Sequence, residues 1–270
     1  MQKIFELLVF DQYAENYRNF PAFPHLVDKN SSWQMIFKKF YYHYNNMAIS
    51  FNIEELDKVI GGKLEEGIIT NCYGEAGSGK SNMAMQLCTN CIRNSKKVIY
   101  VDTENGFTPE RFIQMHKKED LNKVHIYKPK TFDEQLKTTQ LVEKDTDENI
   151  GLVIVDSIVS LYRLILHDNI ADANYKLTKQ FYILSGLAES RKIPVFVTNQ
   201  VYADFDTGDV ELVGRDIPKY FSKTIIKLEK TGDNARCATL TKHRFMPEGK
   251  KVNFEIKEKG LFSAKKFGFF

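Results

Sequence analysis

A glycine-rich segment at residues 73–86, YGEAGSGKSNMAMQ, has the residue types and spacing that phosphate chemistry requires. Gly74, Gly79, Lys80 and Ser81 fit the pattern G-x-x-x-x-G-K-[ST], with an apolar run before it and an apolar-periodic run after it. Main-chain N–H groups of such a loop turn onto phosphate oxygens at the positive end of the following helix. We therefore predict a triphosphate site in which Lys80 reaches the β- and γ-phosphates and Ser81 binds Mg²⁺. The residues expected around the phosphates are Gly74, Glu75, Ala76, Gly77, Ser78, Gly79, Lys80 and Ser81.

Two acidic side chains follow apolar runs that are typical of buried strands. Asp156 ends LVIVD, and Glu104 stands just after VIYVD in the segment VDTEN. Ligands of open α/β sheets bind at the carboxyl ends of the strands. Asp156 is therefore predicted to hold the Mg²⁺ shell, and Glu104 to orient and deprotonate an attacking water. Asp102 competes for the second role, with helix capping as its alternative, and Glu104 has the alternative of a solvated loop acid.

A neutral amide follows another apolar run, because Gln200 comes directly after IPVFVTN. At a strand end it can hydrogen-bond the γ-phosphate or the water and report hydrolysis to the loop that follows. A turn formed by the Asn-Gln pair is the alternative interpretation.

The elements that position these residues are indicated by hydrophobic runs and capping patterns. Thr108, followed by Pro109 and Glu110, predicts the start of a helix. The other elements expected up to residue 199 are strands at 67–73, 97–102, 123–128, 150–156 and 193–199, and helices at 79–93, 131–144 and 171–191. Residues 223–230, 236–244 and 251–260 are typical of short antiparallel strands. The fold class is therefore α/β, a mostly parallel twisted sheet with helices on both faces and antiparallel strands at the C-terminal edge.

Composition limits the remaining possibilities. No run approaches the ~20 apolar residues of a membrane helix, and the first residues do not read as a signal peptide. Four irregularly spaced cysteines favour a reducing cytosol over a disulfide framework, and Cys88 and Cys91 are expected to pack on one face of a helix. Residues 1–46 hold 12 of the 34 aromatic residues and show no strand–helix alternation. Either translation starts at Met47, or these residues are a short helical extension.

Several segments together are similar to one family. YGEAGSGKSNMAMQLC, VIYVDTENGFTPERF, LVIVDSIVSLYR, IPVFVTNQVYAD and TKHRFMPEGKKVNFEIKEKG resemble the RecA/RadA recombinase ATPases, and most of all the short archaeal paralogues of RadA. The resemblance covers roughly residues 48–262. It implies a RecA-like P-loop ATPase core at 47–262, with an uncertain extension at 1–46 and a tail at 263–270.

The resemblance implies a function in recombinational DNA repair, with ATP and Mg²⁺ as cofactors. The short paralogues are regarded as recombination mediators that hydrolyse ATP weakly and work with the RadA recombinase and the Hjc junction resolvase. A cytoplasmic, nucleoid-associated protein is expected. By the family pattern, Arg111 lies along the adenine, and Lys242 and Arg244 reach the nucleotide of an adjacent subunit. Such trans cations stabilise charge on the transferring phosphate, so a monomer is expected to hydrolyse ATP slowly.

The sequence departs from strand-exchange recombinases in two respects. Residues 1–46 are too short for the helix-hairpin-helix domain of those recombinases, and they show neither its G-hydrophobic-G hairpin nor an F-x-x-A polymerisation segment. The segment 201–215, which corresponds to a DNA-gripping loop in the recombinases, carries Asp204, Asp206, Asp209 and Glu211 against Arg215 alone. Because DNA is bound by neutralising its phosphates, an acidic loop predicts against strand exchange through a filament. Self-association stays open.

Basic charge concentrates near the C-terminus. It is carried by Lys242, Arg244, Lys250, Lys251, Lys257, Lys259, Lys265 and Lys266. This cluster predicts either sequence-independent DNA binding or a solvated sheet edge on which lysines block edge-to-edge pairing. The final KKFGFF resembles half of a sliding-clamp-binding peptide but lacks its glutamine, so a sliding clamp is a disfavoured partner.

Three other classes of function remain as alternatives to a mediator. A RadA-like strand-exchange enzyme would show strong DNA-stimulated ATP hydrolysis. A KaiC-like signalling ATPase would autophosphorylate or form rings without DNA. A small-molecule kinase is least favoured, because no arginine-rich lid segment is visible.

Overall fold

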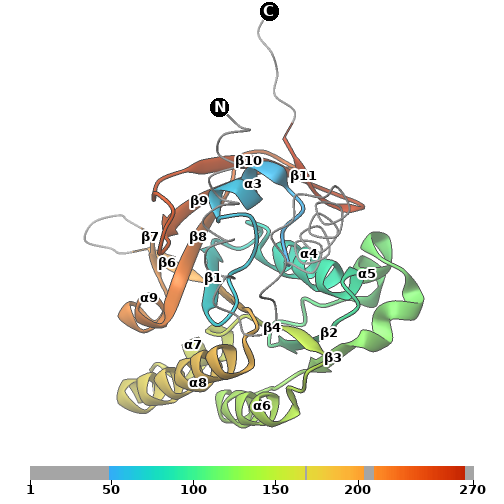
Figure 1. The fold of residues 1–270 in the computed structure, drawn as a ribbon. Coiled ribbons are helices and arrows are strands. Elements are labelled where there is room, and N and C mark those ends of the chain that lie inside the picture. Colours follow the sequence, from blue (N-terminus) through green and yellow to red (C-terminus); the bar gives the residue numbers. More distant parts are fainter. Residues whose placement is uncertain (1–48, 168, 204–209, 265–270) are drawn as a thin grey trace, which may run out of the picture. The chain divides into compact units, whose positions relative to one another are not determined.

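The computed structural model describes residues 49–167, 169–203 and 210–264. Within them, nine strands form one sheet in the order β11-β10-β9-β8-β1-β5-β4-β2-β3 (Figure 1). These strands are β1 (Ile69–Gly74), β2 (Lys97–Asp102), β3 (Val124–Tyr127), β4 (Ile150–Asp156), β5 (Val195–Asn199), β8 (Ser222–Lys230), β9 (Ala235–Lys242), β10 (Lys251–Lys257) and β11 (Gly260–Ser263). The strands from β8 to β3 in this order pair in parallel, and β8 to β11 pair antiparallel. The predicted fold class is confirmed.

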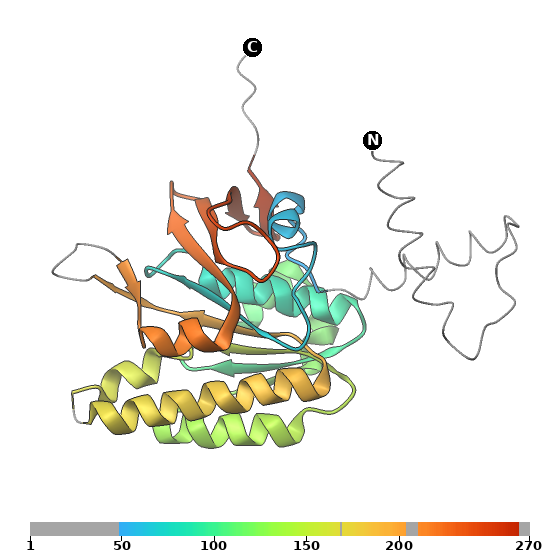
Figure 2. The same cartoon turned by 60° about the vertical axis from the view of Figure 1, so that its left-hand side comes forward.

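Helices cover both faces of the sheet. The helical elements are α3 (Glu54–Val59), α4 (Lys80–Arg93), α5 (Pro109–Met115), the 3₁₀ turn η1 (Lys118–Lys123), α6 (Phe132–Asp145), α7 (Ser160–Ile165), α8 (Ile170–Arg191) and α9 (Asp216–Phe221). One core cluster packs α3, α4 and α5 against the sheet, and a second packs α6, α7 and α8 against the other face. Figure 2 shows α6 and α8 together on one side, with α4 on the opposite side.

Capping residues explain where α5, α6 and α8 begin. Thr108 caps α5 by accepting a hydrogen bond from the Arg111 N–H, with Pro109 at the first helical position. Thr131 caps α6 and Asn169 caps α8 in the same way. The helix predicted from Thr108 is therefore confirmed together with its capping residue.

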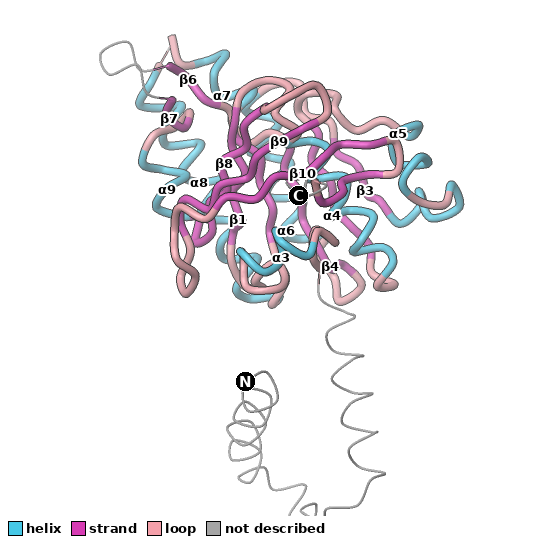
Figure 3. Tube along the Cα trace, turned by 90° about the horizontal axis from the view of Figure 1, so that it is seen from above, coloured by secondary structure: helices cyan, strands magenta, loops and turns pink. Residues whose placement is uncertain are grey.

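The structure differs from the sequence expectation at short elements. The predicted strand 251–260 is two strands, β10 and β11, because Glu258 and Lys259 form the turn of a hairpin. Helices α3, α7 and α9 are six residues each and give too few turns for a hydrophobic period. Strands β6 (Val201–Ala203) and β7 (Val210–Leu212) form a separate two-stranded sheet near α9 (Figure 3).

Cys88 and Cys91 lie fully buried in the core on α4, as the packing interpretation expected. Burial raises the pKa of the Cys91 thiol to about 12, so it is an inert packing group rather than a reactive one. None of the helices that the structure describes is long and apolar enough to cross a membrane. The interpretations of residues 1–46 and of the final KKFGFF fall on residues outside the described ranges and stay predictions.

Candidate functional site

The predicted phosphate loop connects the carboxyl end of β1 to the first turn of α4. A Cβ on Gly74 would lie 2.3 Å from the Leu228 carbonyl oxygen, and one on Gly79 would lie 2.9 Å from Ile256 Cδ1. Gly79 also has φ 102°, in the left-handed region. Both positions therefore require glycine, and the loop packs tightly against β8 and β10.

The polar groups of this loop suit an anion. The Lys80 ammonium donates to the carbonyls of Gly74 and Glu75, each at 2.8 Å, so it lies folded over the loop. The Ser78 hydroxyl is buried and has no hydrogen-bond partner among the described residues. An unpartnered buried hydroxyl is costly in a folded protein. A bound phosphate would accept from both side chains, so the residues present fit the predicted nucleotide.

The predicted metal ligands are brought together. A Cβ on Gly106 would lie 3.3 Å from Ser81 Oγ and 3.5 Å from Asp156 Oδ2, so both oxygens border the same glycine. The Ser81 hydroxyl also hydrogen-bonds the Asp156 carboxylate. Hydroxyl and carboxylate oxygens are the protein ligands that Mg²⁺ takes beside a nucleotide, so this donor set fits the metal as well.

Two buried hydroxyls hold the Asp156 carboxylate in place. Thr198 donates to Oδ1 at 2.5 Å and Tyr100 donates to Oδ2 at 2.8 Å. Burial raises the pKa of Asp156 above its ordinary value, and the charge of nearby Glu104 adds to this rise. The hydrogen bonds from Thr198, Ser81 and Tyr100 lower it. A divalent cation at this position would further favour the ionised form.

The predicted base and the predicted amide are in direct contact. Gln200 Nε2 donates to Glu104 Oε1 at 2.6 Å, and Gln200 Oε1 accepts from Arg163 Nη1 at 2.6 Å. Because Arg163 has no acceptor, it fixes which end of the amide faces Glu104. The exposed Glu104 thus has one hydrogen-bond partner, which comes from the segment after β5 and is oriented by Arg163.

The Asp102 carboxylate is buried and is bonded to the main chain of the loop that follows β2. It accepts from the Gly106 N–H at 2.9 Å and the Phe107 N–H at 3.2 Å, and lies 3.5 Å from Lys128 Nζ. The side chain is fully buried. Asp102 therefore folds the loop that presents Glu104, while Thr108 caps the helix that follows.

Arg111, expected along the adenine, joins three elements. Its guanidinium donates to Asn82 on α4 and to the carbonyls of Lys257 and Glu258 in the β10–β11 turn, at 2.6–3.0 Å. Desolvation lowers its pKa from the ordinary arginine value. These bonds hold the Arg111 guanidinium between the β10–β11 turn and the first turn of α4.

Lys242 and Arg244 lie away from the chain's own phosphate loop. Leu228 of β8 pairs with Gly74, whereas Lys242 pairs with Ile225, three residues earlier on β8. At ~3.3 Å per residue this is roughly 10 Å toward the amino end of β1. Lys242 Nζ donates to the Lys219 carbonyl, and Arg244 forms an ion pair with Glu65 at 3.0 Å.

The acidic segment is only partly described. Asp204, Asp206 and Asp209 lie outside the described residues, whereas Glu211 forms an ion pair with Lys219 at 2.7 Å. The Arg215 guanidinium lies 6.0 Å from the centre of the Tyr202 ring. The one described acid of this segment is thus neutralised within the fold.

The C-terminal basic residues differ in their partners. Lys257 forms an ion pair with Glu255 at 2.7 Å and lies over the Phe262 ring. Within residues 210–264, Lys250, Lys251 and Lys259 are exposed and have no ion pair or side-chain hydrogen bond, while Lys265 and Lys266 lie outside the described ranges. Lys250 and Lys251 stand at one end of β10 and Lys259 beyond its other end, so these free charges are not one compact patch.

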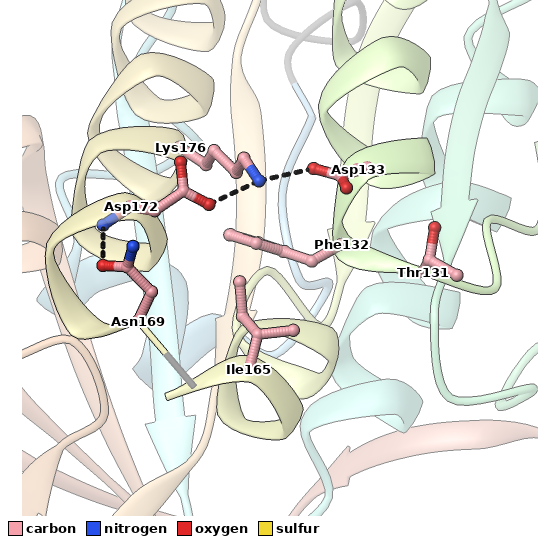
Figure 4. A pocket seen from close by; sticks show the side chains of 7 residues that line it. All are labelled: Thr131, Phe132, Asp133, Ile165, Asn169, Asp172 and Lys176. Carbon is pink, nitrogen blue, oxygen red and sulfur yellow. Dashed lines mark hydrogen bonds and ion pairs between the residues drawn. The ribbon is translucent and has the colours of Figure 1, made fainter. Parts of the chain in front are cut away.

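A cavity of about 210 Å³ lies between the amino ends of α6 and α8, and no residue of the phosphate loop lines it (Figure 4). Lys176 bridges Asp133 at 2.7 Å and Asp172 at 2.5 Å along its rim. Phe132 and Ile165 form its apolar wall. The charged groups at this cavity satisfy one another, so we assign it no role in nucleotide binding.

Four residues that contact the site carry no motif in the sequence. Tyr100 and Thr198 bond to Asp156, Arg163 bonds to Gln200, and Arg236 bonds to the Gly77 carbonyl of the phosphate loop. Tyr100 and Thr198 carry hydroxyls inside apolar runs that predict buried strands. A hydroxyl in such a strand needs a hydrogen-bond partner, and this was the only sequence signal for either residue. Arg163 and Arg236 carry no local pattern, because each acts on a segment that is distant in sequence.

Comparisons with known proteins place these features in a family context. The profile of the Rad51 family matches residues 43–264. Among curated relatives, the DNA repair and recombination protein RadB of Methanococcoides burtonii is 39% identical over 76% of this chain and 93% of its own length. The RadB of Methanococcus maripaludis is 41% identical over 76% of this chain and 96% of its own. A crystal structure of the RadB recombinase superposes with a TM-score of 0.72 at 34% identity, covering 80% of this chain and all of that one.

Proposed function

The chain belongs to the Rad51 family and, within it, to the RadB proteins, and on this premise we propose that it is an ATP- and DNA-binding mediator of homologous recombination with weak ATPase activity. In this role it assists a recombinase and does not itself perform strand exchange. The curated relatives carry the description of DNA repair and recombination proteins.

The observation that supports ATP chemistry best is the meeting of residues from three strand ends. Ser81 and Asp156 border one glycine, and Glu104 contacts Gln200 beside them. Lys80 would bind the triphosphate, Ser81 and Asp156 would hold Mg²⁺, and Mg²⁺ would supply positive charge to the phosphate oxygens. Glu104 would accept a proton from the attacking water while Gln200 orients it.

The positions of Lys242 and Arg244 support slow hydrolysis by a single chain. Each is bonded to a partner away from the loop, to the Lys219 carbonyl and to Glu65. A cation supplied to the transferring phosphate accelerates hydrolysis by about 10³–10⁵-fold in other nucleotide hydrolases. Without an adjacent subunit, this acceleration is missing.

DNA binding is proposed through the free basic residues of the C-terminal strands. Lys250, Lys251 and Lys259 are exposed and unpaired among the described residues, so they are available to phosphates without sequence preference. The proposed protein partners, RadA and the Hjc resolvase, rest on the family resemblance alone.

Single-turnover hydrolysis of radiolabelled ATP tests this function, with and without single-stranded DNA and RadA. We expect a slow rate for the purified protein, and no strand exchange in a gel assay. Glu104→Gln should keep ATP affinity and lose hydrolysis, which separates binding from chemistry. Fast DNA-stimulated hydrolysis together with strand exchange by the protein alone would show instead a RadA-like enzyme.

A further inference from the structure

A buried arginine that the proposed chemistry does not use lies against the phosphate loop. Arg236, the second residue of β9, is 8% exposed, and its Nε donates to the Gly77 carbonyl at 3.1 Å. Its Nη1 donates to the carbonyls of Gly232, Asp233 and Ala235 at 2.8–3.2 Å. One guanidinium thus ties the β8–β9 turn to the middle of the loop, 159 residues away in sequence.

The charge of Arg236 is not neutralised by a carboxylate. Its described hydrogen-bond partners are all main-chain carbonyls, and none of the ion pairs among residues 49–167, 169–203 and 210–264 includes it. Arg244, by contrast, pairs with Glu65. A guanidinium stays protonated in proteins, and a buried charge without a counterion is rare because of its desolvation cost. A full positive charge therefore remains behind the phosphate loop.

The contact also fixes the orientation of a loop peptide. Gly77 has φ 73°, and a Cβ there would meet nothing within 4 Å, so there is open space at its Cα. The Ser78 N–H of the same peptide donates to the Glu75 carbonyl at 3.2 Å, and Arg236 holds the carbonyl side of that peptide. A loop that binds an anion must keep its carbonyls turned away from the phosphates. Because the Gly77 carbonyl accepts a hydrogen bond from Arg236, it is held toward the β8–β9 turn. Arg236 also packs beside Gly79, where a Cβ would lie 3.8 Å from its Cγ and Nε.

We propose that Arg236 is a positioning residue for the nucleotide phosphates: its guanidinium holds the Gly77 carbonyl outward and adds an uncompensated positive charge behind the loop. This inference rests on the proposed function, because it assigns a further group to the same nucleotide site. Its effect grows with the number of phosphates, since it acts on them and not on the base.

The test compares Arg236→Gln and Arg236→Lys with the wild type in binding ATP, ADP and AMP. Loss of a hydrogen bond from a charged group predicts a Kd for ATP and ADP raised by about 10- to 100-fold in Arg236→Gln. The Kd for AMP should change by less than about threefold. Arg236→Lys keeps the charge but loses the fixed donor geometry, so it should show a smaller loss with the same order among nucleotides.

The matched control is Arg93→Gln. Arg93 also donates to a main-chain carbonyl, that of Met115, but it lies at the carboxyl end of α4, whereas the phosphate loop precedes the amino end of that helix. It should leave all three affinities within about twofold of the wild type. Melting temperatures without nucleotide report whether each variant is folded.

A selective loss of ATP and ADP affinity in folded Arg236→Gln supports the proposal. Wild-type affinities, or an equal loss for ATP, ADP and AMP, would overturn it and leave Arg236 a purely structural residue. If Arg236→Gln does not fold, the same comparison made with Arg236→Lys decides. A wild-type protein with no ATP affinity would refute the proposed function itself, so the two failures are distinguishable.

Discussion

The hydroxyl of Thr198 should stabilise the fold mainly through the charge of Asp156. Both residues are buried, and the donor–acceptor distance to Oδ1 is 2.5 Å. Thr198→Val replaces this hydroxyl by a methyl of similar size and leaves one carboxylate oxygen without that donor. A hydrogen bond to a charged group contributes about 1.5–3 kcal/mol and a neutral one about 0.5–1.5 kcal/mol. At pH 8 without nucleotide, the free energy of unfolding should therefore fall by about 1.5–3 kcal/mol.

Thr89→Val is the matched control, because the Thr89 hydroxyl is equally buried but donates to the neutral Gln86 carbonyl at 3.0 Å. Its loss should be about 0.5–1.5 kcal/mol at every pH. The hydrogen bond from Thr198 lowers the folded pKa of Asp156, so its stabilisation is present when the carboxylate is ionised and is lost as pH falls through that pKa. The difference between the two variants should accordingly shrink toward pH 4.

Urea unfolding of both variants between pH 4 and pH 8, in EDTA, measures this difference. If Thr198→Val loses no more than Thr89→Val at pH 8, or if the gap does not change with pH, then Asp156 is not an ionised carboxylate held by Thr198. In that case Asp156 would not be the charged ligand that the metal-binding position requires.

Two further predictions concern a partly buried acid and the basic strands. Burial raises the pKa of Asp57 to about 6, so the folded state binds its proton more tightly and stability falls as pH rises from about 4 to 6. Asp57→Asn should reduce that fall by about 1 kcal/mol after solvent screening, as urea unfolding at pH 4.5 and 7 would measure, and an unchanged fall would refute the assignment. Charge reversal at Lys250 and Lys251 should weaken DNA binding and lower its log–log salt slope by about 1.5–2, whereas reversal at the exposed Lys137 and Lys144 of α6 should not. Equal effects in both pairs would leave the basic strands a solvated edge.

The sequence predicted those parts of the site that depend on local patterns. Glycine spacing, an apolar run before the loop and an amphipathic run after it define the phosphate loop without knowledge of the sheet. Asp156, Glu104 and Gln200 were placed at strand ends, and parallel strands bring such ends to one edge. The contact of Glu104 with Gln200 follows from that rule.

The sequence could not predict contacts that depend on strand order and register. Thr198 reaches Asp156 because β5 lies beside β4, with Val197 opposite Val155, although α7 and α8 separate the two strands along the chain. Arg236 reaches Gly77 only because β9 follows β8 in the sheet and the β8–β9 turn folds toward the loop. Neither arrangement has a signature in residue spacing.

The nucleotide site is tested most directly by calorimetry of ATP binding with Mg²⁺ and with EDTA, for the wild type and for Lys80→Ala. The ammonium of Lys80 lies over the loop, and Ser81 and Asp156 meet beside it. We expect tighter binding with Mg²⁺ than with EDTA in the wild type, and a loss of about 10- to 100-fold or more in a folded Lys80→Ala. No ATP binding by the wild type, or equal affinity in Lys80→Ala, would contradict this expectation.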